Sequence, residues 1–340
     1  MGEEVALFRP SFNAAVKVET RTERLSGDAG YLLLREAMKR TGIIDYLCQR
    51  LSDPRDRTRI EHSMAELLRA SLAMIAQGWI DQADAARLRD DPLLSIAGSD
   101  RRGLGAGGKA LASQASFSRL LDRLAGKDNA AIIDAAPLRL AATRIRSANR
   151  SHLPRLCTID IDGLPLPAHG HQAGSAFNGH VGARIHYPLI ASCAESGDML
   201  AALLREGNAG PAKQAAQWIP KLVSQAQGQL ARKIQVRLDA GFTDGKTLAA
   251  LDEHGIDYVG RQTLLSLRLL AYQLMHVLRC LLERATKTGW SLRRLRERIL
   301  KSAARVQGKA RELVVILERR AAKAWRKLLP TLERLKAAPG

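Results

Sequence analysis

The sequence LCTIDIDG, residues 156–163, decides how the chain folds. It has the composition of a buried β-strand that ends in a turn at Gly163. Asp160 and Asp162 stand two positions apart, so both carboxylates lie on the same face of the predicted strand. We therefore expect a buried strand that carries two acidic side chains toward its carboxyl end.

Strands and helices alternate after this stretch. Several strands followed by a β-α-β order predict an α/β layer structure. The predicted strands are residues 186–191, 199–204, 234–239 and 256–259, and the predicted helices are residues 213–225 and 247–254. The fold class that we expect for the whole chain is mixed α and α/β, with helical regions on both sides of this core.

The flanking regions show apolar residues at three- and four-residue spacing, which is typical of helices. Ser63 and Glu66 predict a capping box at the start of one helix, and a shorter helix is expected from Ser116, as its cap, to Leu124. Residues 313–317 fit a helix or a strand equally well. The predicted regions are a flexible arm at 1–27, a helical region at 28–150, the α/β core at 151–260 and a basic helical region at 261–340.

Positive charge is concentrated in the last part of the chain. The 340 residues contain 53 Lys+Arg and 34 Asp+Glu, a formal net charge of +19, and residues 261–340 alone hold 20 Lys+Arg against five Glu and no Asp. A basic region of this kind predicts a polyanionic partner, because neutralising phosphates releases condensed counterions. The other interpretation is a solvated basic surface.

Carboxylates at strand ends are the most informative candidates for chemistry. Asp239 closes the strand predicted at 234–239, and Asp160 and Asp162 lie in a strand of the same sheet. Buried strand ends tolerate ionised carboxylates only when these are paired or bind a cation, and Mg²⁺ prefers oxygen ligands. A magnesium site for phosphoryl transfer and a set of turn-forming or capping aspartates are equally compatible with this pattern.

Several function classes are excluded or disfavoured by the sequence. The segment from Gly103 to Lys109 resembles a phosphate-binding loop, but Ala110 follows where a hydroxyl should bind magnesium. The histidines at 152, 169, 171, 180 and 186 lack a cysteine at ligand spacing, so we do not expect zinc. Four scattered cysteines, no signal peptide and no apolar stretch of membrane-spanning length favour a cytoplasmic location.

Taken together, the motifs resemble those of DDE-type transposases of bacterial insertion sequences, in the branch called transposase DDE domain group 1. The resemblance is collinear from about residue 20 to residue 260. It is carried by SGDAG (26–30), GWIDQAD (78–84), LRDDP (88–92), LASQ (111–114), DID (160–162), HGHQ (169–172), FNG (177–179), LREGN (204–208) and RLDAGF (237–242).

This resemblance implies a ribonuclease-H-like core, magnesium, and cut-and-paste strand transfer at the inverted repeats of the element. It implies Asp162, with Asp160 beside it, as the first catalytic aspartate and Asp239 as the second, so that Asp162 and Asp239 would bind the metal. The implied partners are double-stranded DNA and a second copy of the chain, in a bacterial cytoplasm at the nucleoid. The helical region at 28–150 would then serve DNA binding or dimerisation. No membrane partner is expected.

The sequence departs from the family pattern in two places. Leu164 stands where the family has Thr or Ser, and the chain passes from Arg261 directly into a run that resembles the helix downstream of the catalytic glutamate. An internal deletion that removed an inserted domain and this third acid is the simplest account. Of the five glutamates after residue 261, Glu283 comes closest to replacing the third acid. We therefore expect a protein that binds DNA and cuts it weakly or not at all.

Three interpretations stay open at this point. The first is an impaired transposase, the second a non-enzymatic DNA-binding remnant that inhibits full-length transposase, and the third an unrelated metal nuclease with a similar core. Arg119 and Arg123, on the open face of the helix that ends at Leu124, are candidates for DNA recognition. The arginines of the basic region at 293, 294, 296 and 298 (Arg293, Arg294, Arg296, Arg298) are candidates for DNA backbone contacts.

Overall fold

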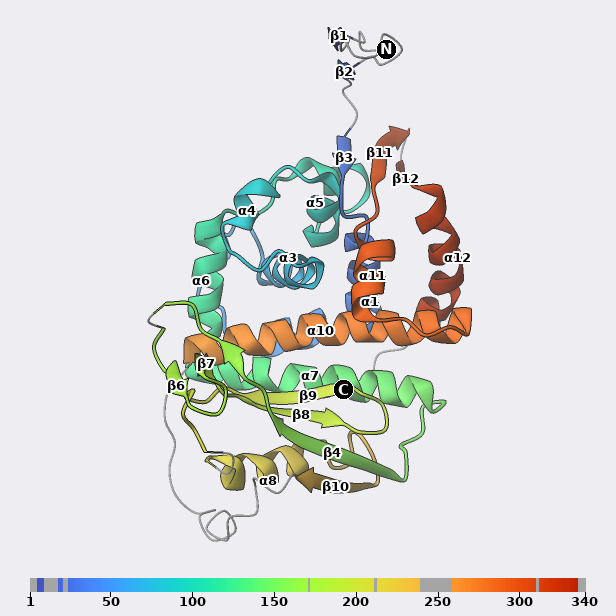
Figure 1. Ribbon diagram of the computed structural model, residues 1–340. Coiled ribbons are helices and arrows are strands. Elements are labelled where there is room, and N and C mark those ends of the chain that lie inside the picture. Colours follow the sequence, from blue (N-terminus) through green and yellow to red (C-terminus); the bar gives the residue numbers. More distant parts are fainter. Residues whose placement is uncertain are drawn as a thin grey trace.

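In the computed structural model, most helices of the chain pack on one side of a mixed sheet (Figure 1). The structure describes residues 5–8, 18–20, 24–170, 172–210, 213–238, 259–309 and 312–335. The amino-terminal part holds β1 (Val5–Phe8), β2 (Val18–Thr20), β3 (Arg24–Ser26), α1 (Tyr31–Thr41), α2 (Ile43–Arg50), α3 (Met64–Gln77), α4 (Asp84–Arg87), α5 (Pro92–Gly98), the 3-10 turn η1 (Gly103–Gly108), α6 (Gln114–Leu124) and α7 (Lys127–Ala148).

The middle of the chain holds most of the strands. These are β4 (Leu156–Gly163), β5 (Leu166–Pro167), β6 (Ala176–Asn178), β7 (Ala183–His186), β8 (Leu189–Cys193), β9 (Met199–Leu203) and β10 (Lys233–Leu238), with α8 (Ala215–Ala226) between the last two. The carboxyl-terminal part holds α10 (Val259–Thr286), α11 (Leu292–Leu295), the π-helical turn η3 (Arg296–Leu300), β11 (Ala304–Lys309), β12 (Glu312–Leu317) and α12 (Arg319–Glu333).

The main sheet has the strand order β10-β4-β8-β9. β10 runs parallel to β4, whereas β8 runs antiparallel to both β4 and β9. A small sheet, with the order β5-β7-β6, is inserted between β4 and β8. The stretch at 156–163 is therefore a central strand, as its sequence predicts.

Two helices separate the sheet from the rest of the molecule. α7 and α10 lie side by side, with α1–α6, α11 and α12 on one side and the main sheet on the other (Figure 1). α7 buries Ile133 and Leu140 in the larger core, which it shares with α10, and Ala141 and Ile145 in the core beneath the sheet. Because α7 is apolar on two faces, it joins the two hydrophobic cores.

One strand of the amino-terminal part and two strands of the carboxyl-terminal part form a third sheet, with the order β12-β11-β3. Ala304 pairs with Ser26, and the N–H of Gly30 donates to the carbonyl of Leu300 at 2.6 Å. A Cβ on Gly30 would lie 2.2 Å from the Cα of Leu300, so only glycine fits at this position. The SGDAG motif thus holds the amino-terminal region against the carboxyl-terminal region.

Some predicted boundaries are confirmed and others are wrong. The capping box of α3 is present, with Ser63 accepting from the N–H of Glu66 at 3.0 Å and Glu66 accepting from the N–H of Ser63 at 3.2 Å. α6 begins earlier than expected, because Ser113 rather than Ser116 is its N-cap. The single strand expected at 186–191 is split between β7 and β8 around Pro188, which has no N–H to donate to a ladder.

Three further expectations concern the remaining segments. Residues 313–317 form a strand, β12, which pairs with β11. The helix expected at 247–254 and positions 256–258 of the last expected strand lie outside the described residues. Val259, the end of that expected strand, is instead the first residue of α10.

Candidate active site

The two acidic side chains of β4 lie on the face of the sheet opposite its hydrophobic core. Cys157, Ile159 and Ile161 alternate with them and are buried together with residues of α7 and α8. Asp160 is half-buried and Asp162 is exposed. The alternation of β4 therefore directs its apolar residues into the core and its carboxylates to an accessible surface.

Asp160 is paired with an arginine of the neighbouring strand. Arg237, its direct partner in the parallel register of β10 and β4, donates to the two carboxylate oxygens through Nε and Nη2 at 2.6 Å each. This hydrogen bonding, together with the charge of Asp160, raises the pKa of Arg237. One step along the same face, Gln235 donates to Thr158 Oγ1 at 3.0 Å. The guanidinium of Arg237 therefore already occupies Asp160 on the face of the sheet that Asp160 shares with Asp162.

Asp162 has a different environment at the end of β4. Its Oδ1 accepts a hydrogen bond of 2.7 Å from the N–H of Gly163. The ring of Tyr187 covers the backbone at Gly163, where a Cβ would lie 2.7 Å from Tyr187 Cζ and Oη. Glycine at 163 thus lets an aromatic ring approach the strand end beside the carboxylate. Asp162 itself offers hard oxygen donors to solvent, which suits a divalent cation such as Mg²⁺.

Asp239, the second expected metal ligand, lies outside the described residues. Leu238, the residue before it, is paired with Ile161, the residue before Asp162. Parallel strands carry equivalent residues toward the same edge of a sheet, which is the geometric reason for expecting the two aspartates to act together.

Glu283 does not lie at this end of the sheet. α10 crosses the turn between β8 and β9, where Gln273 accepts from the N–H of Met199 at 3.0 Å and His276 contacts the carbonyl of Ser196 at 3.2 Å. This turn is at the opposite end of β8 from Leu189, which pairs with Gly163. Glu283 is about 10 Å further along α10 and binds Arg279 and the N–H of Trp290.

A buried ionic cluster, which sequence reasoning missed, joins α7, the β8–β9 turn and α10. Asp198 has no exposed surface and accepts two hydrogen bonds from Arg144 Nε, at 2.6 and 2.8 Å, and one from Ser196 Oγ at 2.6 Å. Gln273 also donates to Asp198, and His276 lies 3.7 Å away. Burial alone would lower the pKa of Arg144, but the hydrogen bonds and the charge of Asp198 raise it. The sequence feature that could have indicated this cluster is Arg144, a charged residue within the apolar pattern of a helix.

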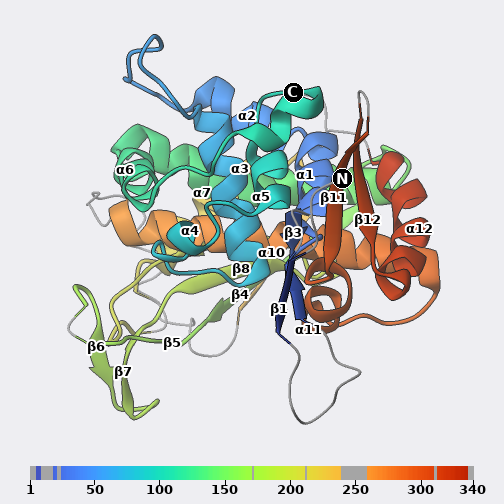
Figure 2. The ribbon, with the colours of Figure 1, turned by 90° about the horizontal axis from the view of Figure 1, so that it is seen from above.

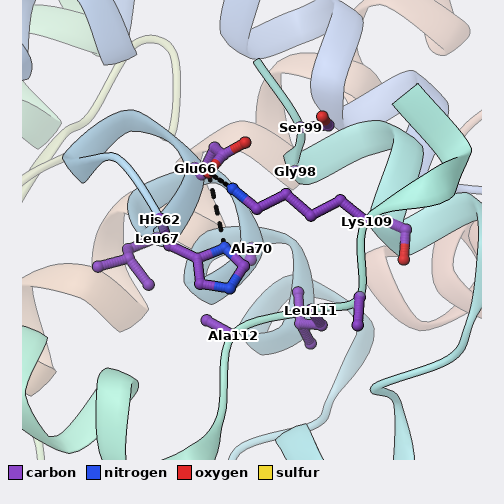
Figure 3. A pocket seen from close by; sticks show the side chains of 11 residues that line it. His62, Glu66, Leu67, Ala70, Gly98, Ser99, Lys109, Leu111 and Ala112 are labelled. Carbon is purple, nitrogen blue, oxygen red and sulfur yellow. Dashed lines mark hydrogen bonds and ion pairs between the residues drawn. The ribbon is translucent and has the colours of Figure 1, made fainter. Parts of the chain in front are cut away.

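A pocket with a charged cluster in its wall lies among the amino-terminal helices (Figure 3). Glu66 is its centre, with Lys109 Nζ at 2.7 Å and His62 Nδ1 at 3.6 Å. Burial raises the pKa of Glu66, but hydrogen bonds from Lys109 and from backbone N–H groups outweigh it, and the pKa is lowered. The amine of Lys109 is therefore engaged within the protein, and the Gly103–Gly108 segment is a 3-10 turn rather than a phosphate loop.

Of the two candidate arginines on α6, one is exposed and the other is covered. Arg119 is exposed. The expectation that Arg123 lies on the open face was wrong, because its side chain is only 14% exposed and its Nε lies 3.5 Å from Asp53. The exposed face of α6 is narrower than the sequence pattern indicated, because Asp53 lies beside Arg123 in its last turn.

The four candidate arginines of the basic region have different environments. Arg293 is exposed and pairs with Glu297 at 2.8 Å, and Arg294 stacks on the ring of Trp290 with its guanidinium carbon 4.3 Å from the centroid. Arg296 is half-buried, close to Gly78 and Met275, whereas Arg298 is exposed. Only part of this group is therefore accessible to a phosphate backbone.

A more continuous basic surface, missed by the sequence reasoning, lies on α12. Its buried face is apolar and consists of Ala321, Trp325, Leu328 and Leu332. Its opposite face exposes Arg319, Lys323, Arg326 and Lys327, and no ion pair of these four is found among the described residues. The sequence feature that could have indicated this surface is the helical spacing of the apolar residues in 321–332, which places the four cations on the opposite face of the helix.

Among the described residues, the group best able to hold a soft metal is Cys157, Cys193 and Glu195 rather than the histidines. The two thiols are buried, with their sulfurs 3.2 Å apart. His169 and His180 are exposed, His186 is buried against Gln172, and His171 lies outside the described residues.

The sequence of the chain matches a family of transposases. The match is to the family described as transposase DDE domain group 1, and it covers residues 8–264, more than half of the chain. It ends in the first part of α10, close to the junction at Arg261. No match was found among the curated proteins or among the solved structures. None of the helices in the described ranges has the length and apolarity that crossing a membrane requires. The strand-end carboxylates of β4 therefore stand in a chain that belongs to the DDE transposase family, which has a role in DNA transposition.

Proposed function

We propose that this protein is a DNA-binding transposase with an incomplete catalytic centre, which acts on double-stranded DNA at the inverted repeats of its element as a homodimer. The observation that carries the proposal is the exposed carboxylate of Asp162 at the end of β4, in a chain of the DDE family. The catalytic core would be residues 151–260, ribonuclease-H-like in fold, between the helical region at 28–150 and the basic region at 261–340.

The donor chemistry of Asp162 fits a divalent metal, with Mg²⁺ as our proposal. Asp162 is accessible and accepts only one backbone hydrogen bond among the described contacts, whereas Asp160 is bound to Arg237. Asp162 and Asp239 would hold the ion, and Asp160, paired with Arg237, would lie beside it on the same face. When bound, the ion would activate the attacking hydroxyl and stabilise charge on the phosphate.

Impaired cleavage is the expected consequence of a missing third ligand. The sequence after Arg261, which resembles the part of the family that follows the third acid, already lies within α10. Glu283 accepts a hydrogen bond from the N–H of Trp290, far from the end of the sheet that carries Asp162. With fewer carboxylates the reacting groups would be held less rigidly, and loss of such positioning costs orders of magnitude in rate.

DNA binding would rest mainly on the solvent face of α12. Four cations on one face of a helix can neutralise successive phosphates, and each such contact adds about 0.9 to the salt slope of the binding constant. Replacing Lys323, Arg326 and Lys327 on this face by Gln should therefore flatten the slope by roughly 3. Exposed cations at the end of the main sheet opposite Asp162, namely Arg155, Arg232 and Lys233, provide a control with the same loss of charge.

Nicking of a supercoiled plasmid in Mg²⁺ or Mn²⁺ tests the catalytic part of the proposal. We expect slow nicking by the wild-type protein and none by Asp162→Asn, with Asp122→Asn, an exposed aspartate of α6, as the matched control. Equal nicking by wild type and Asp162→Asn would show that this carboxylate is not the catalytic one.

A second candidate function is a non-enzymatic DNA-binding protein that inhibits full-length transposase. It is favoured by the position of Glu283 away from Asp162. Wild-type protein that binds DNA, never nicks it, and blocks cleavage by a complete relative would support this function over the first.

A further inference from the structure

The small sheet β5-β7-β6 leaves the main sheet directly at the candidate active site. It begins after Asp162 and Gly163, where the N–H of Leu164 donates to the carbonyl of Pro188 at 3.0 Å, and it returns at Leu189, which pairs with Gly163. Figure 2 shows β5, β6 and β7 extending outward from the body of the molecule. Side chains that are exposed on this small sheet are therefore held near the carboxyl end of β4.

The segment that follows β9 fastens the small sheet in place. Gly207 packs so closely that a Cβ would lie 2.0 Å from the carbonyl oxygen of Ile185 and 2.5 Å from that of Ala176. Asn178 donates to the carbonyl of Gly207 at 2.8 Å. Buried Arg205 donates to the carbonyl of Tyr187 at 2.9 Å, and burial lowers its pKa to about 10. The small sheet is thus rigidly oriented relative to the main sheet.

The surface of this sheet is apolar and cationic. Phe177 on β6 is 65% exposed, whereas Phe117 in α6 is buried. Arg184, the cross-strand partner of Phe177, is also exposed. The chain contains no Asp or Glu from Gly163 to Ala194. An exposed aromatic ring with a cation opposite it on the neighbouring strand is the arrangement on which unstacked nucleic-acid bases stack.

We propose that Phe177 stacks on a base of a DNA strand that is opened next to the candidate active site, which rests on the DNA-cleaving function proposed above. Arg184 stands five residues before Leu189, so an extended chain places it within about 17 Å of the end of β4, and its cross-strand partner Phe177 lies about 5 Å further away. Each strand of B-form DNA advances about 3.4 Å per nucleotide and an opened strand at least as much, so the contacted base lies within about seven nucleotides of the phosphate at Asp162.

Binding to two DNA probes tests this inference. One is an intact duplex, and the other is the same duplex with a three-nucleotide gap that exposes 2-aminopurine, whose fluorescence is quenched by stacking. We expect Phe177→Ala to weaken binding to the gapped probe roughly tenfold and to remove the quenching, with binding to the intact duplex changed less than twofold. Phe177→Tyr should restore both, whereas Phe177→Leu should not. Leu25→Ala, at an apolar residue of β3 that is 69% exposed, is the matched control and should change neither.

Different results separate the two proposals. If wild-type protein binds both probes and Phe177→Ala binds the gapped probe equally well, the stacking role is wrong and the proposed function stands. An equal loss on both probes would also overturn it, because the residue would then be a general DNA contact. Wild-type protein that binds neither probe would overturn the proposed function and this inference with it.

Discussion

Arg237 donates hydrogen bonds of 2.6 Å to both carboxylate oxygens of Asp160, its direct neighbour across the parallel strands β10 and β4. This pairing distinguishes two aspartates that the sequence presents as equivalent. Asp160 is held by a cation, and Asp162, two residues further on the same face, is exposed at the strand end. The first aspartate therefore stabilises the strand pair, and the second is available to a ligand.

Replacing Arg237 by Ala should strengthen divalent-metal binding at this face. The positive charge of Arg237 opposes a second cation nearby, and its removal also releases the carboxylate of Asp160. We expect Mn²⁺ to bind roughly threefold more tightly, as measured by titration calorimetry. Lys233→Ala removes the same charge at the other end of β10 and should have little effect. Weaker Mn²⁺ binding by Arg237→Ala would mean that Arg237 organises the site instead.

Replacing Arg144 by Met should destabilise the protein strongly. The carboxylate of Asp198 would remain completely buried without its main counter-charge, which costs about 3 kcal/mol or more. Urea unfolding measures the free energy of unfolding. Arg40→Met breaks an exposed pair with Glu36 of similar length, 2.6 Å, and should change it by less than about 0.5 kcal/mol. Equal losses in the two variants would show that the ion pair at Asp198 is not essential to the junction between α10 and the sheet.

Stability should fall as the pH falls below about 6.5, the pKa of an unfolded histidine. Burial lowers the pKa of His276, outweighing the opposing charge of Asp198, and burial also lowers the pKa of His62. Between each lowered pKa and 6.5 the unfolded chain binds a proton that the folded chain does not, so unfolding is favoured. His276→Gln should reduce the slope of stability against pH by about 1 kcal/mol per pH unit. His180→Gln, at an exposed position, is the matched control.

Gly207→Ala should detach the small sheet from the main sheet. The added methyl would collide with backbone oxygens of Ile185 and Ala176, which cannot move without breaking β7 or β6. We expect a loss of about 1–3 kcal/mol in unfolding free energy and faster hydrogen exchange at 176–186. Gly210→Ala, where the added Cβ would meet nothing within 4 Å, should change neither measurement. Unchanged exchange in Gly207→Ala would show that the contact does not hold the sheet.

Local sequence patterns predicted the elements that depend on near neighbours. The alternation in 156–163 predicted β4 and the shared face of Asp160 and Asp162, because side-chain direction in a strand follows from the backbone alone. The capping box of α3 depends only on Ser63 and Glu66, three residues apart. The strand–helix ambiguity at 313–317 was decided by β11, since an isolated apolar run of that length has no preferred partner.

The pairing of distant residues needed the tertiary structure. Asp160 and Arg237 are 77 residues apart, and Arg144 and Asp198 are 54 apart. Nothing in either local sequence shows which charge will meet which, because that depends on strand register and helix packing. The covering of Arg123 by the Asp53 segment has the same origin.

By itself the sequence determined the periodicity of β4, the family to which the chain belongs and the excess of positive charge after residue 261. The fold alone decided which aspartate of the pair is accessible, which end of the sheet receives Glu283, and which cations of the basic region face solvent. The physical reason is that periodicity and composition are properties of neighbouring residues, whereas exposure and ion pairing depend on packing between segments that are far apart in the chain.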